Sequence, residues 1–423
     1  MKNSGKTTGG KCLRIQKSGP LCGRCAVGTS KNAVLPMLAA ALLTREPVVL
    51  HHVPDISDVS DMISLLRTFG ARVSQSGHTL RICARHIKTT SPNFHISSRL
   101  RASFLFMGPL LAREGCVTMP LPGGCAIGRR PIDLHLKGFE ALGVKSITAS
   151  GHVLAWRQTL RGAAVHLAYP SVGATENVIM AACLACGKTV IIGGACEPEV
   201  CDLIGLLTAM GAKAEVKDGR IEIEGAGQLH GAEYTPIPDR IEAGTLMIAA
   251  AVTGGDVRID RAPHKHLMQV TSKLVEAGAE VFPYPGGIRI YGRARTPMDI
   301  VSSPYPGFPT DMQAQFMAAC CVLGGQSTIL ETVFENRFLH VHELIKMGAH
   351  IDVRGNTAVI TGVGRLCGAE VKATDLRAGA ALCIAGLIAD GETVIQDIRH
   401  LDRGYEHIED KLSSLGALIT REV

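Results

Sequence analysis

A repeat of about 70 residues constrains the possible folds of this chain most strongly. Its unit is an amphipathic segment that ends in a glycine, usually Gly-Ala, and is followed by an alternating apolar-polar stretch, as in "LLTAMGAKAEVKDGRIEIEG" (Leu206–Gly225). The glycines that end these segments are Gly70, Gly143, Gly211, Gly278, Gly348 and Gly416, at spacings of 73, 68, 67, 70 and 68 residues. A steady period of this kind indicates one structural unit that occurs six times.

The marker glycine and the alternating stretch together predict a helix followed by a hairpin. A glycine directly after a helix takes the left-handed backbone conformation with little strain. Asp218-Gly219, Gly286-Gly287 and Gly355-Asn356 each separate two alternating stretches, which is typical of a tight β-hairpin turn. Each unit therefore closes with two antiparallel strands.

Each unit also contains a second, more apolar helix. The predicted first residues of these helices are Ser30, Ser98, Ser171, Asp239, Thr310 and Thr374, and their spacings of 68, 73, 68, 71 and 64 residues repeat the same period. Helices this apolar must be buried on nearly all sides. We therefore predict an α/β fold of six βαβαββ units, each contributing one buried helix.

The six buried helices begin with polar residues that a buried helix does not need. These residues are Lys31, Arg101, Glu176, Arg240, Asp311 and Arg377. Each could simply cap its own helix. Because helix N-termini carry partial positive charge and free N–H groups, converging helix starts would instead form a site for an anion. The recurrence of such residues in all six units favours the shared site.

Composition restricts the class of protein. The chain has 423 residues, enough for two or three domains, with 46% hydrophobic and 19% charged residues and a net charge of +6. Aromatic residues make up only 4%, which disfavours nucleic-acid binding by base stacking. The apolar runs, such as residues 244–255, are shorter than the roughly 20 residues of a membrane span. With no secretory apolar stretch, we expect a cytoplasmic protein that binds no membrane.

The cysteines do not form a metal-binding pattern. Of 14 cysteines, Cys22/Cys25 and Cys183/Cys186 form C-x-x-C pairs, but 158 residues separate Cys25 from Cys183. The pairs of a zinc ribbon lie roughly 15–20 residues apart. The segment "HVHE" (His340–Glu343) has no evident third ligand. We therefore expect no metal site.

The loop "GGCAIGRR" (Gly123–Arg130) places a thiol between glycines and two arginines. It begins like a phosphate-binding P-loop, but Arg129-Arg130 stands where that motif needs Lys-Ser or Lys-Thr. Two interpretations stay open from spacing alone. The segment could be a plain connection, or a mobile lid in which the arginines lower the pKa of Cys125 and the glycines allow closure.

Several long motifs, in this order, give a specific resemblance. They are "SKNAVLPMLAAALL", "PGGCAIGRRPIDLH", "FPTDMQAQF", "FENRFLHVHELIKMGA", "ATDLRAGAAL" and "DRGYEHIEDKL". From about Leu13 to the C-terminus the chain resembles the UDP-N-acetylglucosamine 1-carboxyvinyltransferase family of enolpyruvyl transferases. The resemblance implies a two-domain inside-out α/β barrel with three units per domain. It implies domains of residues 31–237 and of residues 1–30 plus 238–423, with the active site in the cleft between them.

The resemblance also implies an activity. The family transfers the enolpyruvyl group of phosphoenolpyruvate to the 3′-hydroxyl of UDP-N-acetylglucosamine by addition and elimination, releases phosphate, and uses no metal or organic cofactor. This reaction opens bacterial peptidoglycan synthesis, and thus cell-wall growth and division. Because both substrates are strongly anionic, convergent cations are expected. Oligomeric state stays open.

The motifs assign the chemistry to particular residues by resemblance. Cys125 matches a lid cysteine that donates a proton to the methylene carbon, can form an adduct with phosphoenolpyruvate, and is the target of the antibiotic fosfomycin. Asp311 matches the residue that acts as general base or orienting group at the 3′-hydroxyl. Phosphoenolpyruvate would be bound by Lys31 (also catalytic), Asn32, Arg130 and Arg403.

The sugar nucleotide has its own implied binding residues. They are Arg101, Arg130, Pro131, Ile132, Asp133, Leu134, Ser171, Val172, Gly173, Asp311 and Val333. Arg337, Asp375 and Arg377 match charged residues of the cleft, either in direct contact with the substrate or in support of residues that are. Three positions depart from the family pattern: Thr29 replaces a glycine, Tyr169 replaces a lysine of some members, and Cys196 replaces a basic residue.

Two other functions fit the same motifs less well. The sister enzyme that makes 5-enolpyruvylshikimate-3-phosphate shares the fold and uses phosphoenolpyruvate, but lacks the cysteine lid. A catalytically silent relative could bind the nucleotide sugar as a regulator, yet it would not need Lys31, Cys125, Asp311 and Arg403 together.

Overall fold

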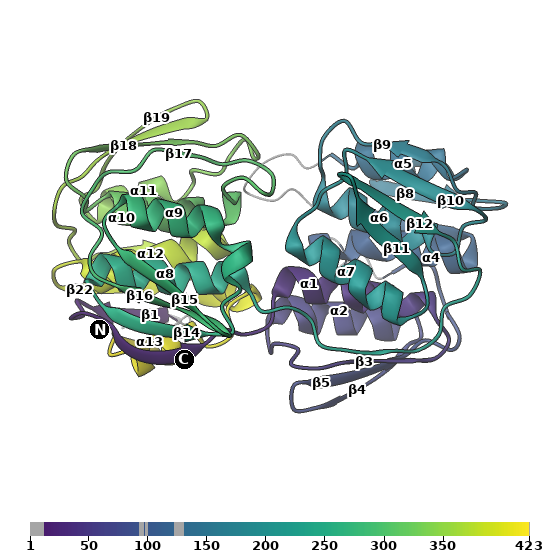
Figure 1. Cartoon of the computed structure of the whole chain (residues 1–423), viewed down its shortest axis with the longest axis horizontal. Coiled ribbons are helices and arrows are strands. Elements are labelled where there is room, and N and C mark those ends of the chain that lie inside the picture. Colours follow the sequence, from purple (N-terminus) through teal and green to yellow (C-terminus); the bar gives the residue numbers. More distant parts are fainter. Residues whose placement is uncertain (1–11, 93–96, 98–99, 122–130, 423) are drawn as a thin grey trace, which may run out of the picture.

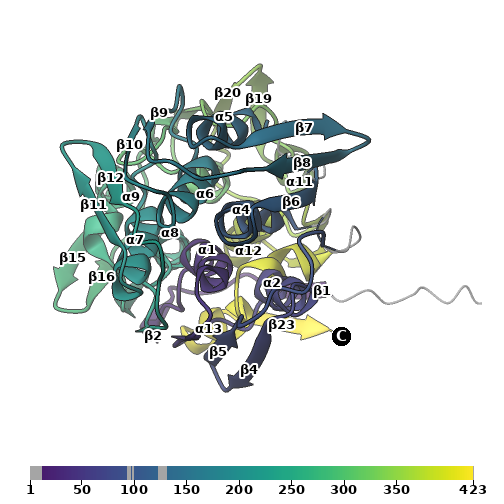
Figure 2. The same ribbon diagram turned by 90° about the vertical axis from the view of Figure 1, so that its right-hand side faces the viewer.

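The computed structural model describes residues 12–92, 97, 100–121 and 131–422. Cys125, Arg130 and Ser98 lie outside these residues. In the described chain the strands form six separate sheets, and helices pack behind them in two halves that lie side by side (Figure 1). Figure 2 looks at one half end-on, with α1 (Lys31–Ala40), α4 (Met107–Glu114) and α6 (Val172–Ala182) in the middle and sheets around them.

The first half contains three of the sheets. Their strand orders are β13 (Glu233–Tyr234), β3 (Pro47–Leu50), β5 (Thr79–Cys83), β4 (Arg72–Ser76); β6 (Cys116–Pro120), β8 (His152–Trp156), β7 (Lys145–Ala149); and β11 (Lys213–Lys217), β12 (Arg220–Glu224), β10 (Lys188–Ile192), β9 (Ala164–His166). The outer helices are α2 (Ser57–Thr68), α5 (Asp133–Ala141) and α7 (Pro198–Ala209), and the 3₁₀ turns are η1 (Ala41–Leu43) and η2 (Arg101–Phe106).

The second half repeats this plan. Its strand orders are β15 (Glu280–Tyr284), β16 (Gly287–Tyr291), β14 (Asp256–Asp260), β2 (Cys22–Ala26); β17 (Ile300–Val301), β18 (Gln326–Leu330), β20 (Thr357–Thr361), β19 (His350–Arg354); and β21 (Glu370–Lys372), β22 (Glu392–Gln396), β1 (Cys12–Gln16), β23 (Leu418–Glu422). The inner helices are α8 (Arg240–Thr253), α10 (Gln313–Cys320) and α12 (Leu376–Ile388); the outer ones are α9 (Met268–Glu276), α11 (Val341–Lys346) and α13 (Ile408–Ser414). The 3₁₀ turns are η3 (His264–His266), η4 (Thr310–Met312) and η5 (Ile398–Arg403).

The six-unit prediction is confirmed at its marker glycines. All six take a positive φ, between 89° and 102°. The predicted turns join β11 to β12, β15 to β16 and β19 to β20, which pair as antiparallel hairpins. The inner helices are buried on all sides: every residue of α8 is buried, including its polar ones. The helices and the hairpin strands thus occur where the 3.6-residue and two-residue periods of the sequence predicted them.

Two of the predicted helix starts were wrong. Thr310 lies inside η4, and α10 follows it. The helix after Thr374 is capped by the next residue, Asp375, whose carboxylate accepts hydrogen bonds from the N–H groups of Arg377 and Ala378. A carboxylate one residue closer to the helix is the better acceptor, and it also favours the positive end of the helix. Ser171 and Asp239 cap their helices as predicted.

The N-terminal strands belong to the second half. Strand β1 lies between β22 and β23 and pairs antiparallel with both, and β2 runs parallel to β14. The chain then enters the first half at Lys31 and leaves it after β13. The two crossing segments pair with each other, since Ser30 N–H donates to the Ile237 carbonyl at 2.8 Å and Asp239 N–H to the Gly28 carbonyl at 2.9 Å.

Two separate hydrophobic clusters form the interior. One is built from buried residues between Ala33 and Leu229, the other from residues between Leu13 and Val27 and between Ile241 and Ile419. We propose that they are the cores of the two domains expected from the sequence, residues 31–237 and residues 1–30 plus 238–423. Among the described residues, none of the helices combines the length and apolarity needed to cross a membrane.

Candidate active site

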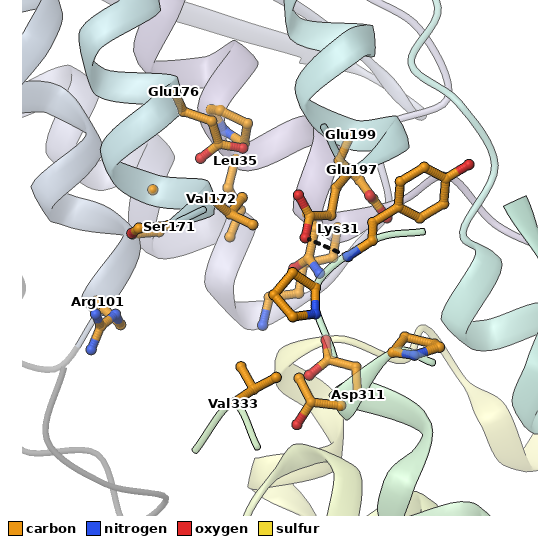
Figure 3. A pocket seen from close by; sticks show the side chains of 18 of the residues that line it. Lys31, Leu35, Arg101, Ser171, Val172, Glu176, Glu197, Glu199, Asp311 and Val333 are labelled. Carbon is orange, nitrogen blue, oxygen red and sulfur yellow. Dashed lines mark hydrogen bonds between the residues drawn. The ribbon is translucent and has the colours of Figure 1, made fainter. Parts of the chain in front are cut away.

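A cavity of about 420 Å³ lies where the two halves meet. It is lined from the first half by the starts of α1, η2 and α6, and from the second half by the starts of α8, η4 and α12 (Figure 3). All six polar residues that begin the buried helices line this one cavity: Lys31, Arg101, Glu176, Arg240, Asp311 and Arg377. The cavity therefore collects helix N-termini and charged side chains in one place, as an anion site requires.

A buried carboxylate links the two halves at one end of the cavity. Lys31 Nζ lies 2.6 Å from Asp58 Oδ2, and Arg403 Nε donates to Asp58 Oδ1 at 2.9 Å. Burial opposes the ionisation of Asp58, but Lys31 and Arg403 outweigh burial and hold the pKa of this carboxyl below its usual range. Burial lowers the pKa of Lys31, and Asp58 opposes that change. The group carries two cations and one anion, so it retains a net positive charge.

Asp58 is a site residue that the sequence analysis missed. It lies in the first turn of α2, 27 positions after Lys31, and its side chain is only 5% exposed. An acidic residue in the first turn of an amphipathic helix is the ordinary pattern for a solvent-facing residue. Only the packing of α1 against α2 turns this residue toward the cavity, so nothing in the local sequence distinguished it.

Asp311 lies between two arginines of the second half. Arg337 Nη2 donates to Asp311 Oδ1 at 2.6 Å, and Arg377 Nη2 donates to Asp311 Oδ2 at 2.7 Å. Burial opposes ionisation here too, but Arg377 and Arg337 outweigh it, so the pKa of Asp311 lies well below its usual range. Asp311 in turn raises the pKa of Arg377. The carboxylate is therefore ionised at any physiological pH and accepts hydrogen bonds only.

An acidic wall formed by Glu176, Glu197 and Glu199 lies on another side of the cavity (Figure 3). Glu199 forms an ion pair with Arg240 through two hydrogen bonds, of 2.9 and 3.2 Å. Glu197 Oε1 accepts a long hydrogen bond of 3.5 Å from Tyr305 N–H. Burial raises the pKa of Glu197. Three carboxyl groups thus lie together on this side of the cavity, and Arg240 forms an ion pair with one of them.

The imidazole of His135, which also lines the cavity, is uncharged because it is buried. Asn177 Nδ2 donates to His135 Nδ1 at 2.9 Å, and Asn177 also bonds to Phe104 and Gly108. Burial, with a smaller contribution from the charge of Arg101, lowers the pKa of His135 to about 3. The imidazole lies close to Gly173: a Cβ at Gly173 would sit 3.3 Å from His135 Cε1. A glycine at this helix start therefore leaves room for the ring.

Most of the residues expected at the site line the cavity. They are Lys31, Asn32, Arg101, Ile132, Ser171, Val172, Gly173, Asp311, Val333, Arg337, Asp375, Arg377 and Arg403. Pro131, Asp133 and Leu134 lie next to Ile132 at the start of α5 and do not line the cavity. The expected positions of Cys125 and Arg130 fall outside the described residues.

The three departures have different surroundings. Thr29 lies in the bridge to Pro238 and does not take a positive φ, so the residue meets no strain there. Tyr169 lines the cavity. Cys196 is half-buried in the segment before α7 and does not line it.

Comparisons with known proteins agree with this arrangement. The family model for EPSP synthase (3-phosphoshikimate 1-carboxyvinyltransferase) matches residues 15–412. The chain is 51% identical, over 96% of its length and 99% of the relative, to UDP-N-acetylglucosamine 1-carboxyvinyltransferase 1 of Caldanaerobacter subterraneus subsp. tengcongensis. It is 47% identical, over 97% of its length and 99% of the relative, to UDP-N-acetylglucosamine 1-carboxyvinyltransferase of Shewanella amazonensis.

Two solved structures share the fold. The enolpyruvyl transferase NikO from Streptomyces tendae superimposes with a TM-score of 0.87 at 24% identity, covering 98% of this chain and 99% of that protein. EPSP synthase from Acinetobacter baumannii superimposes with a TM-score of 0.75 at 17% identity, covering 98% of this chain and 100% of that protein. At these identities the likeness concerns the fold alone, and it confirms the inside-out α/β architecture.

Proposed function

The chain belongs to the EPSP synthase (3-phosphoshikimate 1-carboxyvinyltransferase) family, and we propose that it transfers the enolpyruvyl group of phosphoenolpyruvate to the 3′-hydroxyl of UDP-N-acetylglucosamine. Relatives that are 47–51% identical over nearly the whole chain carry the name of that transferase, which favours the sugar nucleotide over shikimate-3-phosphate as acceptor. The product would enter peptidoglycan synthesis. Both substrates are charged metabolites of the cytoplasm, where we place the protein.

The observation that carries this function is the Lys31–Asp58–Arg403 group at the junction of the two halves. Its excess positive charge faces the cavity, and it combines residues from both halves. We assign Lys31, Asn32, Arg130 and Arg403 to phosphoenolpyruvate. The phosphate and carboxylate of that substrate would take over contacts that Asp58 now makes, so both halves would hold the ligand.

The reaction is an addition followed by an elimination. The 3′-hydroxyl loses its proton as its oxygen forms a bond to C2 of phosphoenolpyruvate, and a proton is added to C3, so a tetrahedral intermediate forms with no net gain or loss of protons. Loss of a proton from C3 and of phosphate from C2 then restores the double bond. We assign the donation of the proton to C3 to Cys125, and the stabilisation of the developing negative charge to Lys31 and the arginines of the site.

Asp311 suits an orienting role in this reaction. Its carboxylate is ionised, and both its oxygens already accept hydrogen bonds from arginines. An acceptor whose pKa lies well below its usual range takes up a proton weakly, but it can hold a hydroxyl in one direction. We propose that Asp311 accepts a hydrogen bond from the 3′-hydroxyl, with Arg337, Asp375 and Arg377 supporting it.

The nucleotide end of the acceptor suits the start of α6. Ser171 caps this helix through Ala174, which leaves the N–H groups of Val172 and Gly173 at the positive end of the helix. We propose that the diphosphate binds there and to Arg101, that Pro131, Ile132, Asp133 and Leu134 with Arg130 hold the uridine, and that Val333 packs against the sugar.

The deciding experiment measures phosphate release from phosphoenolpyruvate. We expect release with UDP-N-acetylglucosamine, none with shikimate-3-phosphate, and loss of release after Cys125 is alkylated by an epoxide such as fosfomycin. Release with shikimate-3-phosphate would replace the acceptor. Binding of the sugar nucleotide without any release would instead favour the silent relative that acts by binding alone.

A further inference from the structure

Glu176 is the one member of the acidic wall, within the described residues, for which the structure shows neither an ion pair nor a side-chain hydrogen bond. It lies in the second turn of α6, lines the cavity, and is only 3% exposed (Figure 3). The next residue, Asn177, differs completely, because its amide bonds to Phe104, Gly108 and His135. The same helix thus holds one fully bonded polar side chain and one that only the cavity can bond.

The charged groups around Glu176 offer it no cation. From α7 and the residue before it come Glu199, already paired with Arg240, and Glu197. His135 of α5 is neutral. Arg101 of η2 lies toward Ser171, at the N-terminal end of α6.

The remaining elements that pack on α6 direct their charges elsewhere. On α4 the charged residues are Arg113, which donates to the carbonyls of Leu42 and Thr44, and Glu114 beside it. On β12 the isoleucines face inward, and Glu222 pairs with Lys188 on the outside. Asp202 of α7 bonds to Tyr234 and to Ile237 N–H.

A carboxylate in this position would be buried without compensation, which costs several kcal/mol. Burial, with the charges of Glu199 and Glu197 adding to it, raises the pKa of Glu176 well above its usual range. Burial among carboxyl groups therefore favours the neutral carboxylic acid over the carboxylate. A protonated carboxyl has one O–H to donate, and in the described structure no protein acceptor receives it.

We propose that Glu176 donates a hydrogen bond from its protonated carboxyl to an uncharged oxygen of the acceptor sugar, a hydroxyl or the acetamido carbonyl. The charges of Glu197 and Glu199 disfavour a phosphate group beside Glu176, while Lys31, Arg101 and Arg403, which also line the cavity, offer cations to the anionic parts of the substrates. Glu176 thus selects the neutral part of the acceptor. This assignment rests on the proposed function.

The test compares two variants of the full chain. Glu176→Gln keeps an N–H donor of similar shape but cannot ionise, and Glu176→Leu removes the donor. The dissociation constant for UDP-N-acetylglucosamine is measured by calorimetry from pH 6 to pH 10. At pH 7 we expect Glu176→Gln to bind within about threefold of the wild type and Glu176→Leu to bind about tenfold more weakly, with KM affected more than kcat.

The pH profile separates this role from a structural one. As Glu176 ionises at high pH, the wild type should lose affinity for UDP-N-acetylglucosamine, while Glu176→Gln should not. The dissociation constant of the wild type should therefore rise relative to that of the variant. Glu224→Gln removes a carboxylate from the exposed surface and is the matched control, with a wild-type profile expected. Equal losses in Gln and Leu variants, or a Gln profile identical to the wild type, would overturn the proposal.

Infrared spectroscopy tests the protonation state without any turnover. The difference spectrum between wild type and Glu176→Gln at pH 7 should contain the C=O band of a carboxylic acid, and carboxylate bands in its place would overturn the proposal. If no phosphate is released but the band and the binding profile hold, the proposed function fails while the role of Glu176 in binding stands. If phosphate is released but the band is absent, the proposed function stands while the role of Glu176 as a hydrogen-bond donor fails.

Discussion

Two carboxyl groups at the starts of buried helices face the same cavity from opposite halves, yet they differ in charge. Asp311 accepts hydrogen bonds from two arginines and is ionised. Glu176 lies buried among carboxyl groups, which raises its pKa and favours its neutral form. The positive end of a helix stabilises a negative charge by only roughly 0.3–1 kcal/mol, and Glu176, in the second turn of α6, receives little of this effect. The difference teaches that neighbouring side chains, and not the helix start, decide the ionisation of these groups.

The comparison extends to the groups around each carboxyl. On the charge-paired side of the cavity, Asp58 joins Lys31 and Arg403 as Asp311 joins its arginines. On the neutral side, His135 is uncharged for the same reason as Glu176, because burial disfavours its ion. One cavity can therefore hold the anionic and the uncharged parts of its ligands in different places.

The largest expected effect comes from removing the charge of Asp311. Asp311→Asn leaves Arg337 and Arg377 buried without their anion, which should cost about 3–5 kcal/mol of the free energy of unfolding. In the proposed orienting role, Asp311 is also the acceptor of the 3′-hydroxyl, so kcat/KM should fall by about 10²-fold. Urea unfolding and phosphate release measure the two effects. Asp352→Asn, which removes an exposed carboxylate paired with Arg354, should leave both unchanged.

Asp58→Asn tests the other charge-paired carboxylate. Because the folded pKa of Asp58 lies below its unfolded value, its stabilisation is complete above about pH 4 and is lost as the pH falls through the folded pKa. We expect the variant to lose about 3 kcal/mol at pH 7 and to show a flatter stability curve below pH 4. Urea midpoints at a series of pH values measure this. A variant as stable as the wild type would mean that Lys31 and Arg403 do not depend on Asp58.

The repeat made the fold predictable because its signals are local. Marker glycines such as Gly211 and turns such as Asp218-Gly219 act within a few residues, and the sequence shows them directly. The convergence of the helix starts was also predicted, because polar residues recur at the start of the buried helix in all six units. Thr310 and Thr374 were assigned wrongly because a 3₁₀ turn from Thr310 to Met312 precedes α10, and because Asp375, one residue after Thr374, caps α12.

The charges of the site could not be predicted from the sequence. Asp58 meets Arg403 across 345 positions, and Asp311 meets Arg377 across 66. The ionisation of a carboxyl depends on such distant neighbours and on burial, neither of which a motif records. The chemical role of Cys125 stays a prediction, because it rests on the loop motif and the resemblance.

On the neutral side, His135 offers a test by acid. Its folded pKa of about 3 lies below the unfolded value of about 6.5, so the unfolded chain binds more protons between these values. Stability should therefore be full above pH 6.5 and decrease by up to about 1.4 kcal/mol per pH unit below it. His135→Gln should remove this part of the slope between pH 7 and pH 5 in urea unfolding. An unchanged slope would show that other groups dominate this range.

The smallest expected effect comes from Gly173→Ala at the start of α6. The new methyl group would lie 3.3 Å from His135 Cε1, slightly too close, so the imidazole must move by a few tenths of an ångström. The hydrogen bond from Asn177 to His135 resists that movement, and the free energy of unfolding should fall by about 1 kcal/mol or less. KM for the sugar nucleotide should rise about threefold with kcat nearly constant, because the methyl group narrows the proposed diphosphate site without touching Asp311.

Gly219→Ala is not a matched control, since its positive φ would add strain. Gly194→Ala introduces a comparably close methyl group, 3.1 Å from Ile191, away from the cavity. A KM that rises equally in both variants would mean that α6 responds to general crowding, whereas a rise confined to Gly173→Ala would place the sensitive contact at its N-terminus, one turn before Glu176.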